Sequence, residues 1–196
     1  MIKTTKNMFE VLSVLFSGKD LSFHDLSKEV KISVMGVSKI IKKLEKEKIV
    51  NVVRIGRSSI ARLNKTRENI ELLSLTEKYK FEKFINKYPN LKGFLMQLKE
   101  RTRTKIDFLL IFGSYASGEI SSDSDLDLLV ASSNKDIYKI LDELSVLIDV
   151  NISPIVITKK DFIKGLKKGH RLYKEIANGK RILVNGHYNF LKLIFT

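Results

Sequence analysis

The chain has 196 residues and a net charge of +14, with 36 Lys and Arg against 22 Asp and Glu, which favours a polyanionic partner such as nucleic acid. It has no cysteine and three scattered histidines, which excludes disulfides, thiol catalysis and cysteine-ligated zinc, so any metal should have oxygen ligands. No apolar run approaches the roughly 20 residues of a membrane span, and no signal-peptide core follows Met1, so we expect a cytoplasmic protein without membrane contact.

The first 64 residues predict three short helices followed by a hairpin. Residues 7–17 repeat apolar side chains at helical spacing, up to Gly18. Ser22 and Ser33 are placed as N-caps of the second and third helices, and Asp25 completes a capping pair with Ser22. Two β-branched runs then flank a basic turn, which is typical of a hairpin.

This pattern resembles a winged helix-turn-helix domain. The segments SFHDLSKEVKIS and VSKIIKKLEKEKIV are similar to those of many archaeal and bacterial regulators. The resemblance implies double-stranded DNA as a partner, with the third helix in the major groove and the hairpin on the adjacent backbone. The cationic side chains would contact phosphates and carry little sequence information. The residues placed nearest DNA in this way are Ser33, Met35, Ser38, Lys39, Lys42, Arg54 and Arg57.

Residues 66–104 predict two helices separated at Tyr88-Pro89-Asn90. Thr66 is placed to cap the first helix, which we expect to link two domains. Long apolar helices between domains often pair with a second copy, so we expect a homodimer.

Residues 105–150 carry 3 Lys and Arg against 9 Asp and Glu, and this acidic segment favours a divalent-cation site. Its first part, KIDFLLIFGS, is an apolar run of strand length that ends at Gly113, after which Ser114 begins a short helix. A second strand runs from Asp125 to Val130, and alternation along it places Asp125 and Asp127 on one face. Two adjacent carboxylates repel unless a cation lies between them, and such a pair can hold one or two Mg²⁺ ions.

The combination FGSYASGEISSDSDLDLLV resembles the minimal nucleotidyltransferases of the polymerase-beta superfamily, over residues 105–157 and more loosely to 186. The resemblance implies that Gly113 and Ser114 hold the triphosphate of ATP or another NTP. It also implies that Asp125 and Asp127 ligate Mg²⁺, which would align the α-phosphate and stabilise the departing pyrophosphate.

The family pattern requires a third carboxylate on a nearby strand, and we expect that strand over residues 147–152. Asp149 lies between apolar neighbours, as the pattern requires, and is a candidate general base. The following ISPIVIT, however, resembles a subgroup joined to winged helices in which an asparagine takes that position, which would make Asn151 the aligned residue. A neutral amide binds Mg²⁺ less well and is not a general base at neutral pH, so catalysis depends on an assignment that stays open here.

The C-terminal residues predict a basic helical stretch over 159–178 and a last strand, RILVNG. The cations of this stretch have two interpretations: contact with the nucleotide or with an acceptor, or a solvated face over an apolar stripe. The pattern favours the solvated face. The residues concerned are Lys167, Lys168, His170 and Arg171.

The sequence therefore predicts an α+β protein. A winged helix domain occupies residues 1–65, a helical linker with a dimerisation role 66–104, and a nucleotidyltransferase-like domain with a mixed sheet and flanking helices 105–196. Our leading hypothesis is a DNA-binding regulator with a Mg²⁺-dependent nucleotidyltransferase domain, and the family resemblance implies an antitoxin that transfers AMP to a partner toxin. Two alternatives stay open: a regulator that only binds nucleotide, and a nucleotidyltransferase acting on nucleic acid held by the winged helix.

Overall fold

The computed structural model describes residues 3–16, 20–56 and 58–195, which form two compact units. The first unit extends to Thr76 and the second runs from Glu77 to Ile194. The boundary lies within one helix, α4 (Ile70–Lys87), in the segment that the sequence predicts to link two domains. None of the described helices is long and apolar enough to cross a bilayer.

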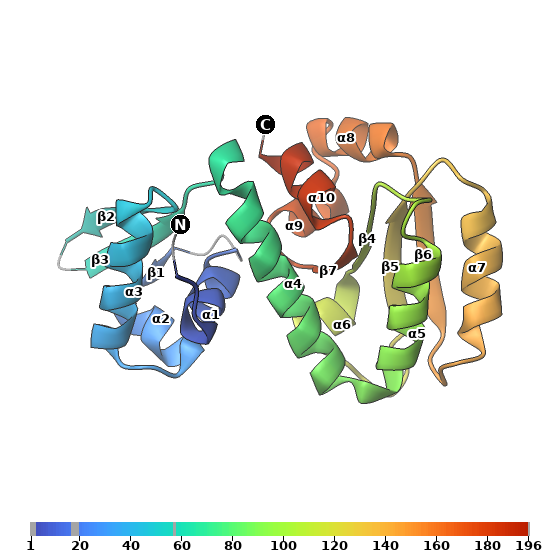
Figure 1. Cartoon of the computed structure of the whole chain (residues 1–196), viewed down its shortest axis with the longest axis horizontal. Coiled ribbons are helices and arrows are strands. Elements are labelled where there is room, and N and C mark those ends of the chain that lie inside the picture. The colour runs from blue at the N-terminus through green and yellow to red at the C-terminus, as the bar shows by residue number, and fades with distance from the viewer. Residues whose placement is uncertain (1–2, 17–19, 57, 196) are drawn as a thin grey trace. The chain divides into compact units, whose positions relative to one another are not determined.

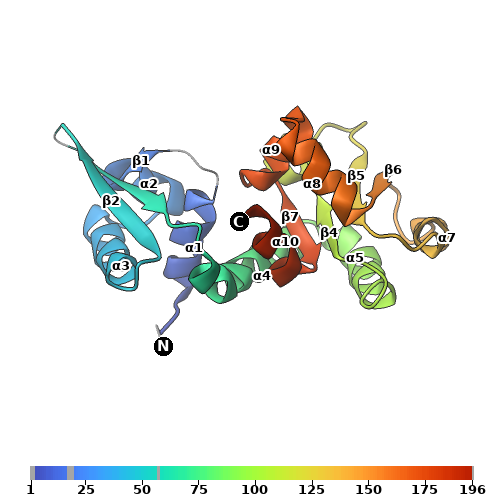
Figure 2. The ribbon, with the colours of Figure 1, turned by 90° about the horizontal axis from the view of Figure 1, so that it is seen from above.

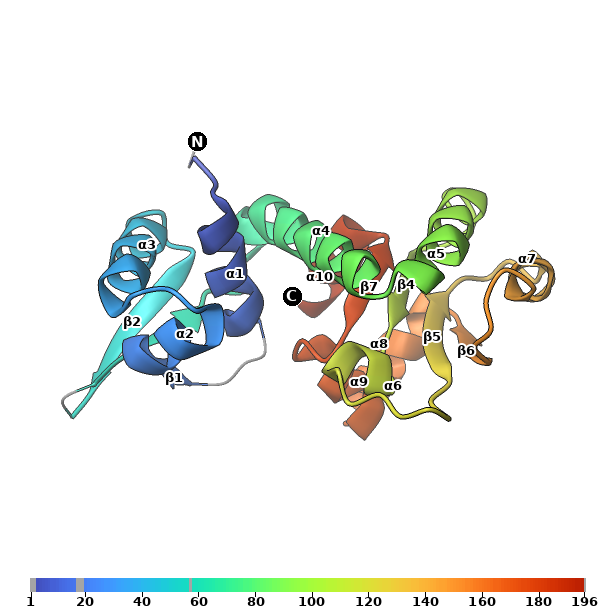
Figure 3. The same ribbon diagram turned by 90° about the horizontal axis from the view of Figure 1, so that it is seen from below.

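The first unit contains three helices and a small antiparallel sheet with strand order β1-β3-β2. Ser22 and Ser33 accept hydrogen bonds from the backbone N–H groups of Asp25 (3.1 Å) and Gly36 (3.0 Å), which confirms both predicted N-caps. Gly18 lies outside the described residues. Figure 3 shows α3 beside the hairpin strand β2. The elements are α1 (Lys6–Leu15), β1 (Leu21–Ser22), α2 (Phe23–Val30), α3 (Val34–Lys46), β2 (Val50–Ile55) and β3 (Ser58–Leu63).

The second unit is built on a four-stranded sheet with strand order β6-β5-β4-β7, and the sheet is mixed, as the family resemblance implies. Strands β5 and β6 are parallel, and the other pairs are antiparallel. The strands are β4 (Phe108–Ile111), β5 (Leu126–Ala131), β6 (Ile152–Ile157) and β7 (Ile182–Asn185). The helical elements after the first unit's hairpin are η1 (Arg67–Asn69), α4, α5 (Pro89–Arg101), α6 (Gly113–Ser117), α7 (Asp136–Ser145), α8 (Lys159–Lys167), α9 (Arg171–Ala177) and α10 (His187–Ile194).

Helices cover both faces of this sheet (Figures 1 and 2). Leu109 and Ile111 of β4 are buried in one core with side chains of α4, α5 and α7. Phe108 points to the other face, where its ring packs on Phe162 of α8 (5.2 Å) and Phe190 of α10 (4.9 Å). The period-2 alternation of β4 therefore supplies two cores, which explains why all four residues of the strand, Phe108–Ile111, are apolar.

In the C-terminal half the structure corrects one sequence prediction and refines another. The strand expected over residues 147–152 is wrong: β6 begins at Ile152, because the end of α7 continues into a turn in which Leu147 N–H donates to the Leu144 carbonyl (3.0 Å). The basic stretch 159–178 divides into α8 and α9 at Gly169, whose φ of 81° ends the first helix. Helix α10 was not predicted.

Candidate active site

The turn between β4 and α6 lies directly against the carboxylate of Asp127. Phe112 N–H donates to the Asp127 carbonyl oxygen (3.1 Å), which fixes the start of α6 beside β5. Gly113 has a φ of 65°, and a Cβ at this position would overlap the Asp127 carboxylate. Only glycine therefore combines the left-handed backbone with this close approach.

Strand alternation places the two aspartates as predicted. Leu126 and Leu128 are fully buried in the core with α5 and α7, so Asp125 and Asp127 face the other way. Burial is the main cause that raises the pKa of Asp127 above its usual value. The negative charge of Asp125 raises it further, and a hydrogen bond with the Ser153 side chain opposes the shift. A bound cation would relieve both unfavourable effects.

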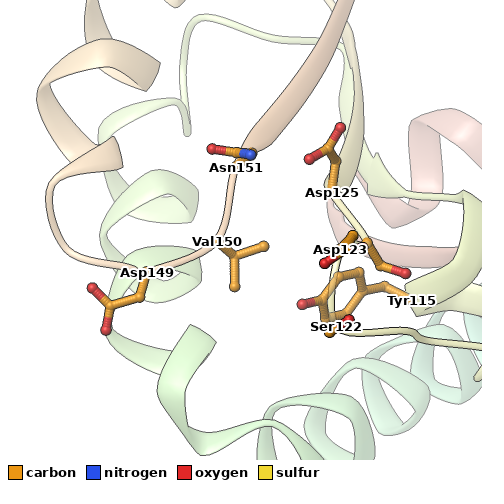
Figure 4. A pocket seen from close by; sticks show the side chains of 8 residues that line it. Tyr115, Ser122, Asp123, Asp125, Asp149, Val150 and Asn151 are labelled. Carbon is orange, nitrogen blue, oxygen red and sulfur yellow. The ribbon is translucent and has the colours of Figure 1, made fainter.

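The register of β6 against β5 decides which residue accompanies the aspartates. Asp127 pairs with Ser153, and Leu126 N–H donates to the Asn151 carbonyl (2.7 Å), so Asn151 lies beside Asp125. Figure 4 shows the Asn151 amide on the side of Asp125, whereas the exposed Asp149 carboxylate points away from it. Within the described ranges, no group of three His, Cys, Asp or Glu side chains could hold a metal ion.

Two pockets adjoin these residues. The first, the acidic pocket, has a volume of about 270 Å³ and is lined by Tyr115, Ser122, Asp123, Ser124, Asp125, Asp149, Val150 and Asn151. The second, the α6/α9 pocket, has a volume of about 400 Å³ and is lined by Phe112, Gly113, Ser114, Ser117, Glu119, Leu172, Glu175, Ile176 and Lys180.

The sequence analysis missed the three charged residues that line the α6/α9 pocket, Glu119, Glu175 and Lys180, because no local pattern distinguishes them from neighbouring charges. Lys167, Lys168, His170 and Arg171 do not line either pocket. His170 stacks on Tyr173 (4.6 Å between ring centres), and Arg171 forms an ion pair with Glu175 (3.0 Å).

The residues predicted to approach DNA lie on α3 and on the hairpin. Met35 (69% exposed), Lys39 and Lys42 of α3 are exposed, and so is Arg54 of β2. Ser38 is half-buried, and the Ser33 hydroxyl accepts the cap hydrogen bond from Gly36. Arg57 lies outside the described residues.

Comparison with protein families identifies both parts of the chain. Residues 89–187, about half of the chain, match the family described as polymerase beta, nucleotidyltransferase. The chain therefore belongs to this nucleotidyltransferase family. Residues 5–51 match the winged helix-turn-helix DNA-binding family, so the resemblance noted for the N-terminal residues is also confirmed.

Three relatives from Methanocaldococcus jannaschii each carry the name "Putative protein adenylyltransferase". One is 32% identical over 76 residues, which are 35% of this chain and 77% of the relative. Another is 32% identical over 111 residues, 52% of this chain and 73% of the relative. The third is 37% identical over 46 residues, 24% of this chain and 46% of the relative. No solved structure is a significant match to the chain.

Proposed function

We propose that the protein is a Mg²⁺-dependent nucleotidyltransferase that transfers AMP from ATP to a hydroxyl group of a partner protein. The observation that carries this proposal is the contact between the Gly113 turn and the carboxylate of Asp127, with Asp125 on the same face. In this arrangement a phosphate on the turn and a cation on the aspartates would be neighbours. The names of the relatives support AMP and a protein as the transferred group and the acceptor.

The side chains around Asp127 fit a Mg²⁺ ion. Asp125 and Asp127 offer carboxylate oxygens. Asn151, directly before β6, adds an amide oxygen, and Ser153 of β6 adds a hydroxyl oxygen. These are the hard oxygen donors that Mg²⁺ accepts, and it commonly binds through one or two carboxylates. When bound, Mg²⁺ would supply charge stabilisation for the transferring phosphoryl group.

The lining of the acidic pocket favours a protein acceptor over a nucleic acid. Asp123 and Asp149 lie there in addition to Asp125, so negative charge would remain after one cation is bound. A polyanionic acceptor would be repelled by this pocket, whereas a hydroxyl-bearing side chain in a neutral or basic protein segment would not. The nucleotidyltransferase that acts on nucleic acid is therefore the less supported alternative.

One observation favours a second candidate, a regulator that binds nucleotide without transferring it. Asn151 lies beside Asp125, and the Asp149 carboxylate points away. Asn151 cannot accept a proton from the hydroxyl of the acceptor. Transfer would therefore require a hydroxyl that is activated within the acceptor, or another residue as the base. On either proposal, the winged helix would bind DNA. On the first proposal, the partner protein would be a toxin, and DNA binding would control the operon.

The test is transfer of label from α-labelled ATP in the presence of Mg²⁺, with cell extract as the source of acceptor. The wild-type protein is compared with Asp125→Ala/Asp127→Ala. We expect label on a protease-sensitive product, and its loss in the double variant. Label on a nuclease-sensitive product would contradict the protein acceptor. If ATP binds but no label is transferred to extract or to a partner encoded beside the gene, the nucleotide-binding regulator is the better account.

A further inference from the structure

The α6/α9 pocket brings one cation next to the turn that is expected to hold phosphate. Among the described residues that line this pocket with Gly113 and Ser114, Lys180 is the one that carries a positive charge. The other charged side chains of the lining, Glu119 and Glu175, are acidic. A polyphosphate in this pocket would therefore depend on Lys180 for a side-chain cation.

Lys180 is presented by a turn with a defined backbone. Helix α9 ends at Ala177, and Gly179 has a φ of 105°, in the region that favours glycine. Lys180 N–H donates to the Glu175 carbonyl (3.1 Å), and Arg181 N–H donates to the Gly179 carbonyl (2.8 Å). The turn thus folds back on the end of α9, and the Lys180 side chain leaves it on the pocket side.

The next residue, Arg181, is fully buried and anchors the same turn. Its guanidinium donates to the carbonyl oxygens of Ile176 (2.6 Å) and Ala177 (3.2 Å), the last residues of α9. It also donates to the buried carboxylate of Glu77 on α4 (2.6 Å) and lies over the Phe190 ring (4.7 Å). Burying a charge pair carries a large desolvation penalty, and apolar residues of similar volume often serve stability equally well. The specific contribution of this pair is the position of the α9 end relative to α4.

In the structure Lys180 forms only a weak ion pair, with Glu175. Its Nζ lies 3.7 Å from Glu175 Oε2, with the Lys180 side chain 67% exposed, and Glu175 is also paired with Arg171 (3.0 Å). An exposed ion pair at this distance contributes little energy, so Lys180 can exchange it for a more highly charged ligand at small cost. Glu175 keeps a partner when Lys180 leaves.

We propose that Lys180 binds the polyphosphate of the nucleotide in the α6/α9 pocket, and that Arg181, held by Glu77, is the positioning residue for it. This inference rests on the proposed function in one respect, namely that the ligand is a nucleoside triphosphate. The site would then include Lys180, from the turn after α9, in addition to the Gly113 turn, Asp125 and Asp127.

The first experiment measures binding of ATP, AMP and tripolyphosphate by calorimetry with Mg²⁺, at about 0.15 M salt to screen weak surface binding. We compare the wild-type protein with Lys180→Ala and with Lys174→Ala, which removes an exposed charge of α9 outside the pocket. We expect Lys180→Ala to weaken ATP and tripolyphosphate binding about tenfold or more, as for loss of a charge-assisted hydrogen bond, with AMP changed less than twofold. Lys174→Ala should match the wild type.

The outcomes separate this inference from the proposed function. If the wild type binds ATP and Lys180→Ala binds it equally well, the role of Lys180 is wrong while the proposed function stands. If the wild type binds neither ATP nor tripolyphosphate, both are wrong. If Lys180→Ala weakens AMP binding as strongly as ATP binding, Lys180 acts on the fold or contacts the nucleoside. The proposed contact with the polyphosphate is then wrong.

The positioning role is tested with Glu77→Leu/Lys80→Met/Arg181→Met, which replaces the buried charges by apolar volume, because Lys80 is also paired with Glu77 (3.2 Å). It is also tested with Arg181→Lys, which keeps the charge but not the planar set of guanidinium donors. Folding is checked by circular dichroism and cooperative melting. We expect a folded variant to bind ATP about tenfold more weakly, and Lys180→Ala added to it to cause little further loss. A folded variant that binds ATP like the wild type, or a full additional loss from Lys180→Ala, overturns the role of Arg181.

Discussion

At the scale of single residues, the site depends on the absence of a side chain at Gly113. The Asp127 carboxylate occupies the space that a Cβ would fill, and the backbone of Gly113 is left-handed. The Cβ of any other residue would meet both the Asp127 carboxylate and the strain of the left-handed backbone. Because the position of Cβ does not depend on the rotamer, no side-chain rotamer removes these two conflicts.

We predict that Gly113→Ala lowers the free energy of unfolding by about 1 kcal/mol or more, from the left-handed backbone alone, and displaces Asp127. ATP binding with Mg²⁺ should fall at least tenfold, measured by calorimetry. The matched control is Gly93→Ala in α5, where a Cβ meets nothing within 4 Å and φ is not positive. This control should be neutral or stabilise the protein by up to about 1 kcal/mol, and normal ATP binding by Gly113→Ala would contradict the geometry of the turn.

His187 gives a second residue-scale prediction. Burial lowers its pKa from 6.5 to about 4, an effect that the nearby charge of Glu77 opposes and those of Lys99 and Lys78 reinforce. Nε2 lies 3.1 Å from the Leu183 carbonyl, which suits a neutral ring that donates from Nε2. The folded pKa is depressed, so the unfolded state binds the proton first. The stability of the fold is complete above pH 6.5 and falls as the pH drops from 6.5 towards 4.

Between pH 6.5 and pH 4 we expect the free energy of unfolding to fall by an amount that approaches about 1.4 kcal/mol per pH unit. Chemical denaturation of the wild type and of His187→Gln at several pH values measures it. The variant should be less stable near neutral pH, but its stability should vary less between pH 6.5 and 4. Equal slopes for the two proteins would show that another group controls this range.

At the scale of elements, the parallel pairing of β5 and β6 determines which polar residues surround the aspartates. The pairing of Asp127 with Ser153 sets Asn151 beside Asp125 and leaves Asp149 ahead of the start of β6, in the turn after α7. The turn carries Asp149 away from the sheet edge, as Figure 4 shows.

We predict that Asp149→Asn changes AMP transfer less than twofold, whereas Asn151→Asp tightens Mg²⁺ binding about tenfold, because a third carboxylate adds a full negative charge at the cation. Metal titration measures the Mg²⁺ dissociation constant, and labelled transfer measures the rate. Loss of transfer in Asp149→Asn would show that this carboxylate turns inward when substrate binds, and the assignment of Asn151 would then be wrong.

Helix α3 carries the second prediction at this scale. Lys39 and Lys42 are exposed on it, and a lysine that binds a DNA phosphate releases counterions. Replacing both by Gln should weaken binding to duplex DNA of any sequence. The slope of log K against log salt concentration should become shallower by about 0.9 for each lysine removed from a phosphate, or nearly 2 in total. Lys92→Gln, an exposed lysine of α5, is the control and should leave the slope unchanged. An unchanged slope in the α3 variant would show that Lys39 and Lys42 do not contact DNA phosphates.

At the scale of the whole molecule, the chain joins a basic DNA-binding domain to a nucleotidyltransferase domain whose acidic segment is an exception in a chain with a net charge of +14. The basic residues suit a polyanion, and the acidic segment suits a cation. The boundary between the two units lies within α4, and Glu77 on that helix is paired with Arg181 beside the α6/α9 pocket.

The sequence by itself determined the features that depend on near neighbours. The caps by Ser22 and Ser33 and the shared face of Asp125 and Asp127 follow from hydrogen bonds and strand alternation within a few residues. The two families could be recognised for the same reason, because their motifs are short and continuous. The mixed sheet was expected from that resemblance.

Only the tertiary structure decided which distant residues complete the site. The choice between Asn151 and Asp149 required the starting point of β6, which depends on where α7 ends and on how β6 pairs with β5. Lys180 could not be found in the sequence, because only the tertiary structure, with Arg181 held by Glu77, brings it to the pocket that Gly113 also lines. Such contacts join residues that are far apart in the chain, and their energy comes from burial and pairing in the folded state, which local patterns do not encode.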